Sequence, residues 1–478
     1  MKLRKKYCSN HLSSFVQLVM IKKNIEMSDL SEQLKVDSKE MADLFIRNKR
    51  STNYSLLLQV IKAIGLNENK IFNRNLSFEK TRNSFFNSFF YCLDSRKIYY
   101  EEIMNYRKEI EETPYFVDLI VIDFIYTVIL VKDRIKANYL SKYILTISTS
   151  LSNYYKKLCY VYYTELLKNS SMFEKGLDFL NYASTIYCND KHLDGRLYYI
   201  GMSIYRGLGN LEKAKNNYFQ AKQYLTETNN IAMLENLNLK YSGLLRISGE
   251  IQAALKNDLK LLEDYTVKQY RLRNIEILFN NIGWTYSLLH NYKKAVIYYQ
   301  KALETLNDND VYFNMAYCLY KIGEDNLSLT YIQRGRKAPV SNAFITPFFD
   351  WLELMIEKPY CSKSYELLKA ISTDYSYCLE DINKTMIQIE IINYYYYNHM
   401  YEEAIHALQP LMGKQLISPS ELIFTKKNEN RNDLLFSEDE LTLRSQMMES
   451  DDLFFEDDEL GEDEWEELDD SFSRFMHN

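Results

Sequence analysis

The chain has 478 residues, which exceeds the size at which one hydrophobic core stops growing and predicts several units or a repeat array. Hydrophobic residues make up 46% of the chain, and only 13 Gly and 6 Pro occur, which excludes a turn-rich β-sandwich or β-barrel. The formal charge of −7 is unevenly distributed: residues 1–80 carry +7, and residues 438–470 carry 17 Asp and Glu against one Arg, or −16. The basic N-terminal part therefore suits a polyanion, and the acidic tail suits a cationic partner.

Cysteine usage and hydropathy indicate a cytoplasmic protein. The seven cysteines are scattered and never form a C-x-x-C pair, so free thiols in a reducing compartment explain them most simply. The N-terminal apolar stretch lacks a small-residue cleavage site, which argues against a signal peptide. The most apolar run, 115–131, contains Asp118 and Asp123, so we expect a buried repeat helix and no membrane partner.

The N-terminal segment 1–70 is expected to form four short helices. Apolar residues at helical spacing give a first helix that ends near residue 23 and a pair of helices within residues 27–46. Small Ser31 stands where the paired helices would cross, and Asp37 is placed to cap the second of them. A further helix is expected over residues 54–64.

The stretch "MSDLSEQLKVDSKEMADLFIRNKR…SLLLQVIKAIGL" resembles the helix-turn-helix domain of the phage-repressor type. Two departures from that pattern concern the turn and the charge of the second helix. Lys35 stands where glycine is usual, which costs roughly 1 kcal/mol if the residue must be left-handed. Glu40 and Asp43 add negative charge to the helix expected to approach DNA, so docking to a protein instead of DNA stays open. The resemblance implies major-groove contacts from Ser38, Lys39, Ala42 and Asp43, and phosphate contacts from Arg47, Lys49 and Arg50.

A 34-residue repeat of the tetratricopeptide type is clearest over residues 276–309. Small residues at fixed positions let paired helices approach, and large residues fill the space between successive pairs. Weaker copies begin at residues 157, 195, 235 and 309, and a partial copy covers 401–408. The template residues of the clearest copy are Ile282, Gly283, Tyr286, Ala295, Tyr299 and Ala302.

The repeat positions also single out candidate peptide-binding residues. In tetratricopeptide families the first helix of each pair lines the concave face, and an Asn at its sixth position commonly clamps a peptide backbone. Asn281 and Asn314 occupy that position, and Lys240 holds it in the preceding repeat, where it can bind a carboxylate. Trp284 lies three residues after Asn281, and Tyr317 lies three residues after Asn314. These aromatic side chains can form the bottom of a binding pocket, or they can be ordinary residues of the hydrophobic core.

A phage-repressor-like head followed by such an array resembles the bacterial peptide-pheromone-responsive regulators of the Rgg, NprR, PlcR and PrgX group. The resemblance implies a homodimer that binds double-stranded DNA at a palindromic operator and changes its affinity when a short peptide occupies the groove. A peptide changes the relative position of the two N-terminal heads of the dimer only if it binds the array more tightly in one curvature than in another.

The acidic tail departs from that group. Its aromatic and aliphatic residues Trp465, Leu468, Phe472 and Phe475 are spaced to lie on one face of a short helix. Such a segment suits docking onto a basic, partly apolar surface. The surface can belong to this chain's own head, where the tail would inhibit DNA binding, or to another protein. A solubilising tail without a partner is the remaining alternative.

We therefore predict an all-α protein without enzymatic activity, cofactor or metal. The expected units are a head at 1–70, a linker helix and irregular pairs at 71–156, the repeat array at 157–412, and the linker and tail at 413–478. Nucleotide and zinc signatures are absent from the sequence. The alternative function is a non-enzymatic scaffold or antagonist in which head and tail dock proteins.

Overall fold

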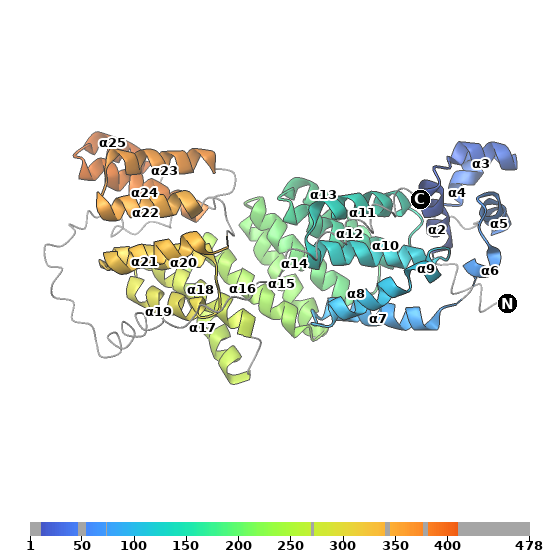
Figure 1. Cartoon of the computed structure of the whole chain (residues 1–478), viewed down its shortest axis with the longest axis horizontal. Helices are drawn as coiled ribbons and strands as arrows, with labels where there is room; N and C mark the ends of the chain where they lie inside the picture. The colour runs from blue at the N-terminus through green and yellow to red at the C-terminus, as the bar shows by residue number, and fades with distance from the viewer. Residues whose placement is uncertain are drawn as a thin grey trace.

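The computed structural model describes residues 11–45, 54–72, 74–268, 272–339, 345–375 and 381–409. Within these ranges the secondary structure is helical, and no strand occurs. The helices form an elongated array that runs from α2–α6 at one end to α22–α25 at the other (Figure 1). The predicted all-α solenoid is confirmed. The DNA-contact candidates Arg47, Lys49 and Arg50 and the tail candidates Trp465, Leu468, Phe472 and Phe475 lie outside the described residues.

The N-terminal third contains short helices followed by longer ones. The bounds are α2 Leu12–Lys22, α3 Met27–Leu34, α4 Ser38–Asp43, α5 Tyr54–Ala63, α6 Glu68–Ile71, α7 Leu76–Phe90, α8 Arg96–Asn105, α9 Arg107–Ile110, α10 Tyr115–Tyr126, the π-helical turn η1 Thr127–Val131, and α11 Arg134–Ile147.

The rest of the described chain consists of consecutive antiparallel helix pairs. The pairs are α12 Asn153–Asn169 with α13 Phe173–Thr185, α14 Lys191–Gly207 with α15 Leu211–Glu227, α16 Ile231–Ile247 with α17 Ile251–Lys268, α18 Leu272–Leu288 with α19 Tyr292–Leu303, α20 Asn309–Ile322 with α21 Asp325–Lys337, α22 Ile345–Glu357 with α23 Ser362–Asp374, and α24 Asp381–Tyr397 with α25 Tyr401–Leu408.

A recurring two-residue turn starts several of these helices. A residue with positive φ ends one helix, and the Asn that follows caps the next helix by accepting a backbone N–H. At α15 the turn is Gly209 with a φ of 72°, followed by Asn210, whose Oδ1 accepts from Lys213 N at 3.0 Å. His290 and Asn291 make the same turn before α19. These short connections force successive helices to lie antiparallel.

Close approach at small residues holds the helix pairs together. A Cβ placed on Gly283 of α18 would lie 2.9 Å from a ring carbon of the fully buried Tyr299 on α19. Between pairs, a Cβ on Gly335 of α21 would lie 2.3 Å from Phe349 of α22. Because the large side chain occupies the space that glycine leaves, each contact is filled without a cavity.

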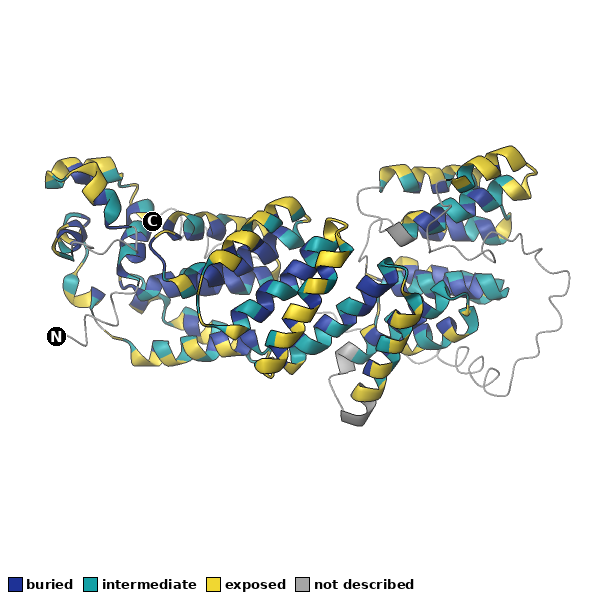
Figure 2. Ribbon diagram, turned by 180° about the vertical axis from the view of Figure 1, so that it is seen from behind, coloured by how far each residue is buried: buried dark blue, intermediate teal, exposed yellow. Residues whose placement is uncertain are grey.

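The hydrophobic core of the head is continuous with that of the array. One buried cluster includes Leu12 of α2 and reaches Leu193 of α14. A second large cluster begins at Ala295 and extends to Ile387. Figure 2 shows the buried surfaces between the helices and the exposed residues on their outer sides. The head is thus packed onto the first helices of the array.

Two further properties follow from the described residues. None of their helices is both long enough and apolar enough to cross a membrane. The cysteines at 92, 159, 188, 318 and 361 are free thiols, and those at 159 and 318 are buried.

Adding a methyl group at Gly335 tests the close approach. The substitution Gly335→Ala forces Phe349 or the Cβ of Tyr312 to move, because the new methyl lies 2.8 Å or less from both. We expect a loss of about 1–3 kcal/mol of folding free energy, measured as a lower urea midpoint.

The matched control is Gly243→Ala in α16, where the nearest atoms to the new Cβ are 3.8 Å away. This variant should keep the wild-type midpoint or gain up to about 1 kcal/mol from its higher helix propensity. Equal midpoints for the two variants would show that Gly335 is not a close-packing position.

Candidate functional site

The turn between α3 and α4 has the geometry that the sequence predicts. Lys35 ends α3 in the left-handed region, with a φ of 55°. Ser31 of α3 is buried, and the Asp37 carboxylate accepts from the backbone N–H of Lys39 at 2.7 Å. The left-handed lysine is strained relative to glycine, and the Asp37 cap on α4 offsets part of this cost.

The predicted DNA-contact residues of α4 share its accessible side. Ser38 and Lys39 are exposed, whereas Ala42 and Asp43 are half-buried. Met41, on the opposite side, is fully buried. The structure therefore brings these four residues together on one surface of the head.

The first helix of the head is attached to the array by polar contacts as well as by its core. Ser14 Oγ of α2 lies 2.9 Å from Ser150 Oγ, which also donates to Gln17 Oε1 at 2.7 Å. Beside these contacts the fully buried Asp118 of α10 pairs with Arg82 at 3.2 Å and accepts from the Tyr155 hydroxyl. A buried, paired carboxylate fixes the positions of the helices around it.

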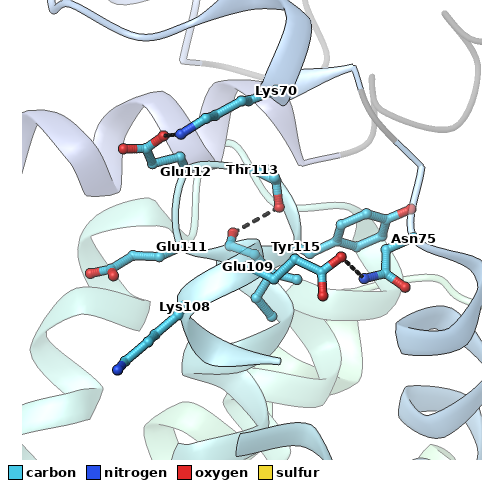
Figure 3. A pocket seen from close by; sticks show the side chains of 9 residues that line it. Lys70, Asn75, Lys108, Glu109, Glu111, Glu112, Thr113 and Tyr115 are labelled. Atoms are coloured by element: carbon cyan, nitrogen blue, oxygen red, sulfur yellow. Dashed lines mark hydrogen bonds and ion pairs between the residues drawn. The ribbon is translucent and has the colours of Figure 1, made fainter. Parts of the chain in front are cut away.

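A polar pocket lies beside this junction, between the start of α7 and the segment from α9 to α10 (Figure 3). Lys70 Nζ of α6 lies 2.5 Å from Glu112 Oε2, and Asn75 Nδ2 donates to Glu109 Oε1 at 2.8 Å. Lys22 of α2 pairs with Glu111. These exposed contacts add little free energy, but they join the head to α9 and α10 at several points.

The first helices α12 and α14, and α16, α18, α20 and α22, lie beside their neighbours, and Lys240 of α16 contacts Ser203 of α14. We call the surface that these first helices share the inner face. Asn281 of α18 and Asn314 of α20 are half-buried on these helices. No residue of the described chain makes a hydrogen bond to either side-chain amide. The backbone carbonyl of Asn281, by contrast, accepts from Thr285 Oγ1 at 2.8 Å. Both amides are available to a ligand.

The predicted aromatic residues are held by charged neighbours. The Arg246 guanidinium lies 4.8 Å from the ring centroid of Trp284 and donates to Asp258 Oδ2 at 2.8 Å. Burial lowers the pKa of Arg246 and raises the pKa of Asp258, because desolvation of the two charges outweighs their attraction. The side chain of Trp284 is therefore held in position by the Arg246 guanidinium.

Tyr317 belongs to a second buried ion network. Its hydroxyl donates to Glu390 Oε1 of α24 at 3.2 Å, and Lys321 Nζ lies 2.8 Å from the same oxygen. Burial raises the pKa of the Tyr317 phenol well above its usual value. The Tyr317 hydroxyl is thus engaged within the chain, unlike the amide of Asn314 three residues earlier.

Lys240 of α16 lies in a different environment from these paired groups. Its ammonium is 4.3 Å from the ring centroid of Tyr199 and donates to Ser203 Oγ at 3.5 Å. No carboxylate of the described residues lies within ion-pair distance of it. Burial lowers the pKa of Lys240, and the nearby Arg206 and Arg196 act in the same direction.

Lys240 belongs to a group that we call the inner-face cation cluster, formed by Lys168, Arg196 and Lys240. The carboxylate that these three cations share is Glu165 of α12, which pairs with Lys168 and whose Oε2 lies 3.8 Å from Arg196 Nη2. Burial opposes the ionisation of Glu165 and would raise its pKa. The charges of Lys168, Arg196 and Lys240 outweigh burial and lower the pKa to about 2. The cluster therefore carries an excess of positive charge.

The sequence pattern had identified only one member of this cluster. Lys240 stands at the sixth repeat position, whereas Lys168 and Arg196 stand at the twelfth and second positions of their own copies. The signal that could have identified Lys168 and Arg196 is the presence of charged residues on first helices that are otherwise largely apolar. Among the described residues, no group of three or more His, Cys, Asp or Glu is arranged to hold a metal ion.

These features define the class of protein as a tetratricopeptide-like α-solenoid with a small helical head packed onto its first helices. A family model described as "Tetratricopeptide repeat" matches residues 278–305, within the copy that the sequence pattern gave as clearest. No curated protein sequence matches the chain significantly.

Several solved structures are similar to the chain. The apo form of RapI is 18% identical, covering 71% of this chain and 99% of its own, with a TM-score of 0.52. The apo form of the quorum sensor NprR from B. thuringiensis is 17% identical, covering 70% and 97%, with a TM-score of 0.55. A Rap protein complexed with Competence and Sporulation Factor is 15% identical, covering 71% and 97%, with a TM-score of 0.56. At these identities the likeness shows a shared fold.

The position of Glu165 predicts a pH dependence of stability. Because its pKa is lowered from 4.5 to about 2, its ionised form stabilises the folded chain above pH 4.5, and this contribution is lost as the pH falls toward 2. In Glu165→Gln this contribution is absent. We expect the stability difference between wild type and variant, measured by urea unfolding, to shrink by about 1 kcal/mol between pH 6 and pH 3.5.

The control is Glu212→Gln on α15, where the carboxylate is exposed. Its stability difference from wild type should stay nearly constant over the same pH range. A constant difference for Glu165→Gln as well would contradict the excess positive charge of the inner face.

Proposed function

We propose that the chain is a DNA-binding transcription regulator whose DNA affinity is switched by a short peptide bound to the inner face of its repeat array. A structure of NprR with its cognate peptide NprX has the same fold, at 17% identity and a TM-score of 0.52. The similar Rap protein was solved with Competence and Sporulation Factor. The proposal includes a homodimer and assigns no catalytic step and no cofactor to the chain.

The observation that carries the proposal is the pair of unengaged amides on α18 and α20. Asn281 and Asn314 hold the same repeat position, are half-buried, and make no side-chain hydrogen bond with the described residues. An amide that both donates to and accepts from one peptide unit binds a backbone without requiring a particular side chain. Two of them on neighbouring pairs favour an extended peptide as the ligand.

The head is placed to respond to such a ligand. Because α2 shares one core with α10, α11 and the first helix pairs, a change in the curvature of the array displaces α2. The proposed DNA surface on α4 is then shifted relative to that of a second subunit. A peptide drives this shift only through its difference in affinity for the two curvatures.

A scaffold or antagonist that docks proteins through its head is the second candidate. Glu40 and Asp43 on α4 favour it, because negative charge on this surface opposes the approach of phosphates. DNA binding by the full chain decides between the two candidates.

Replacing Lys39 tests the DNA surface. Its exposed ammonium at the start of α4 is placed to neutralise a phosphate. In a mobility shift with DNA from the region upstream of the gene, we expect Lys39→Ala to weaken binding roughly two- to tenfold. The slope of log K against log salt should fall by about 0.9.

The control is Lys256→Ala, which removes the same charge from an exposed position on α17. It should leave affinity and slope unchanged. Equal behaviour of the two variants would remove α4 from the DNA contact, and no retardation of any DNA by the wild-type chain would favour the scaffold.

Replacing the two amides tests the peptide site. As the probe we choose the tightest peptide that the full chain selects from a random heptapeptide library. We expect Asn281→Ala and Asn314→Ala each to weaken this peptide roughly tenfold, because each loses about 1–1.5 kcal/mol of hydrogen bonding.

The thermal midpoint of both variants should match that of the wild type, since neither side chain is bonded within the described chain. Asn216→Ala, at an exposed position on α15, serves as the matched control and should bind normally. Undiminished peptide binding by both inner-face variants would show that the ligand lies elsewhere.

A further inference from the structure

We infer that the inner-face cation cluster is a carboxylate-binding subsite, and that the acidic segment 438–470 of the same chain occupies it. The inference rests on the proposed function only in taking the inner face as the ligand site. It assigns the tail a regulatory role there, as an internal competitor of the peptide.

The first argument is the charge imbalance. Lys168, Arg196 and Lys240 share the carboxylate of Glu165, whose pKa is lowered by these cationic neighbours. Other buried charges of the inner face are balanced, as in the pairs of Arg246 with Asp258 and Lys321 with Glu390. Burying an ammonium such as that of Lys240 without a carboxylate in contact is costly. An external carboxylate beside it would relieve that cost.

The second argument is the set of buried polar atoms that lack hydrogen-bond partners. Two of these are donors, Tyr162 Oη and Arg196 Nε, which are both buried and have no hydrogen-bond partner in the described chain. The Arg196 guanidinium lies 4.6 Å from the ring centroid of Tyr162, so the two donors belong to one place on α12 and α14. Native structures leave few such groups unsatisfied, and their clustering marks a place where a polar ligand belongs.

The third argument identifies the occupant. Residues 438–470 carry a formal charge of −16, the largest concentration of carboxylates in the chain. The described chain ends at residue 409, and the stretch from there to residue 438 reaches about 95 Å when fully extended. The cluster on α12, α14 and α16 lies on the order of 50 Å from α25, at the usual spacing of packed helices. The segment can therefore reach the cluster within its own chain.

Occupation of this subsite would make the tail compete with any ligand that extends along the inner face from α18 to α16. A ligand must then displace a segment held at a high effective concentration. Because the attraction is between charges, the competition weakens as salt rises.

Carbodiimide cross-linking of the full chain tests the contact directly. The reagent joins a carboxylate to an amine that it touches. We expect linked fragments that connect Lys240 or Lys168 with residues 438–470, and a loss of at least threefold in their yield at 0.5 M salt. Links from the acidic segment to lysines of the head instead, such as Lys39, would overturn the inference.

A binding assay in trans tests the competition without knowledge of the signalling peptide. The probe is a fluorescein-labelled peptide of residues 451–470. Its affinity should rise about tenfold in a full chain whose Asp and Glu at 451–470 are changed to Asn and Gln, because the subsite is then vacant. In that background Lys240→Glu should weaken the probe at least tenfold, whereas Lys256→Glu should not.

The outcomes separate this inference from the proposed function. Equal effects of Lys240→Glu and Lys256→Glu, or equal probe affinity in the two backgrounds, would overturn the tail contact while leaving peptide binding at Asn281 and Asn314 untouched. A stable fold of Lys240→Glu is checked by its thermal midpoint. If it unfolds, Lys240→Met supplies the same test without the new negative charge, and it should weaken the probe at least threefold.

Discussion

The close approach of helices at small residues is the constraint on which the rest of the structure depends. Where Gly283 meets Tyr299, and where Gly335 meets Phe349, a large buried ring occupies the space that the missing side chain leaves. These contacts fix how α18 packs against α19 and how α21 packs against α22. Neighbouring first helices consequently pack together, as α12 does with α14 and α18 with α20, and this stacking brings residues far apart in sequence onto the inner face.

The kind of polar group on the inner face changes from one end of the array to the other. Cations predominate on α12, α14 and α16, unengaged amides lie on α18 and α20, and a balanced ion network closes the series at α24. A peptide along this face would meet a carboxylate-binding region at one end and backbone-binding amides in the middle. The grading would give a bound peptide a preferred direction, because its carboxylates would favour the end of the face where cations predominate.

The repeat architecture was predictable because it depends on local periodicity. The close packing of the small residues over 276–309 is found as expected, Ser31 in the head is buried, and the unfavourable left-handed Lys35 is observed. The cation cluster was not predictable. Glu165, Arg196 and Lys240 belong to three successive repeats, and their electrostatic coupling depends on how the pairs stack. The pattern of residues along the sequence does not specify the angle at which successive helix pairs stack.

The attachment of the head follows from the same stacking and bears on how a signal would travel. A flexible tether between head and array would let the array change its curvature without moving the head. Here α2 belongs to the core of α10 and α11, and the buried Asp118 with its partners stands where they meet. Packed cores shift between discrete arrangements and do not deform continuously. A change in curvature at α12–α16 would therefore reach α2 as a displacement of the whole helix, and α3 and α4, which share its core, would move with it.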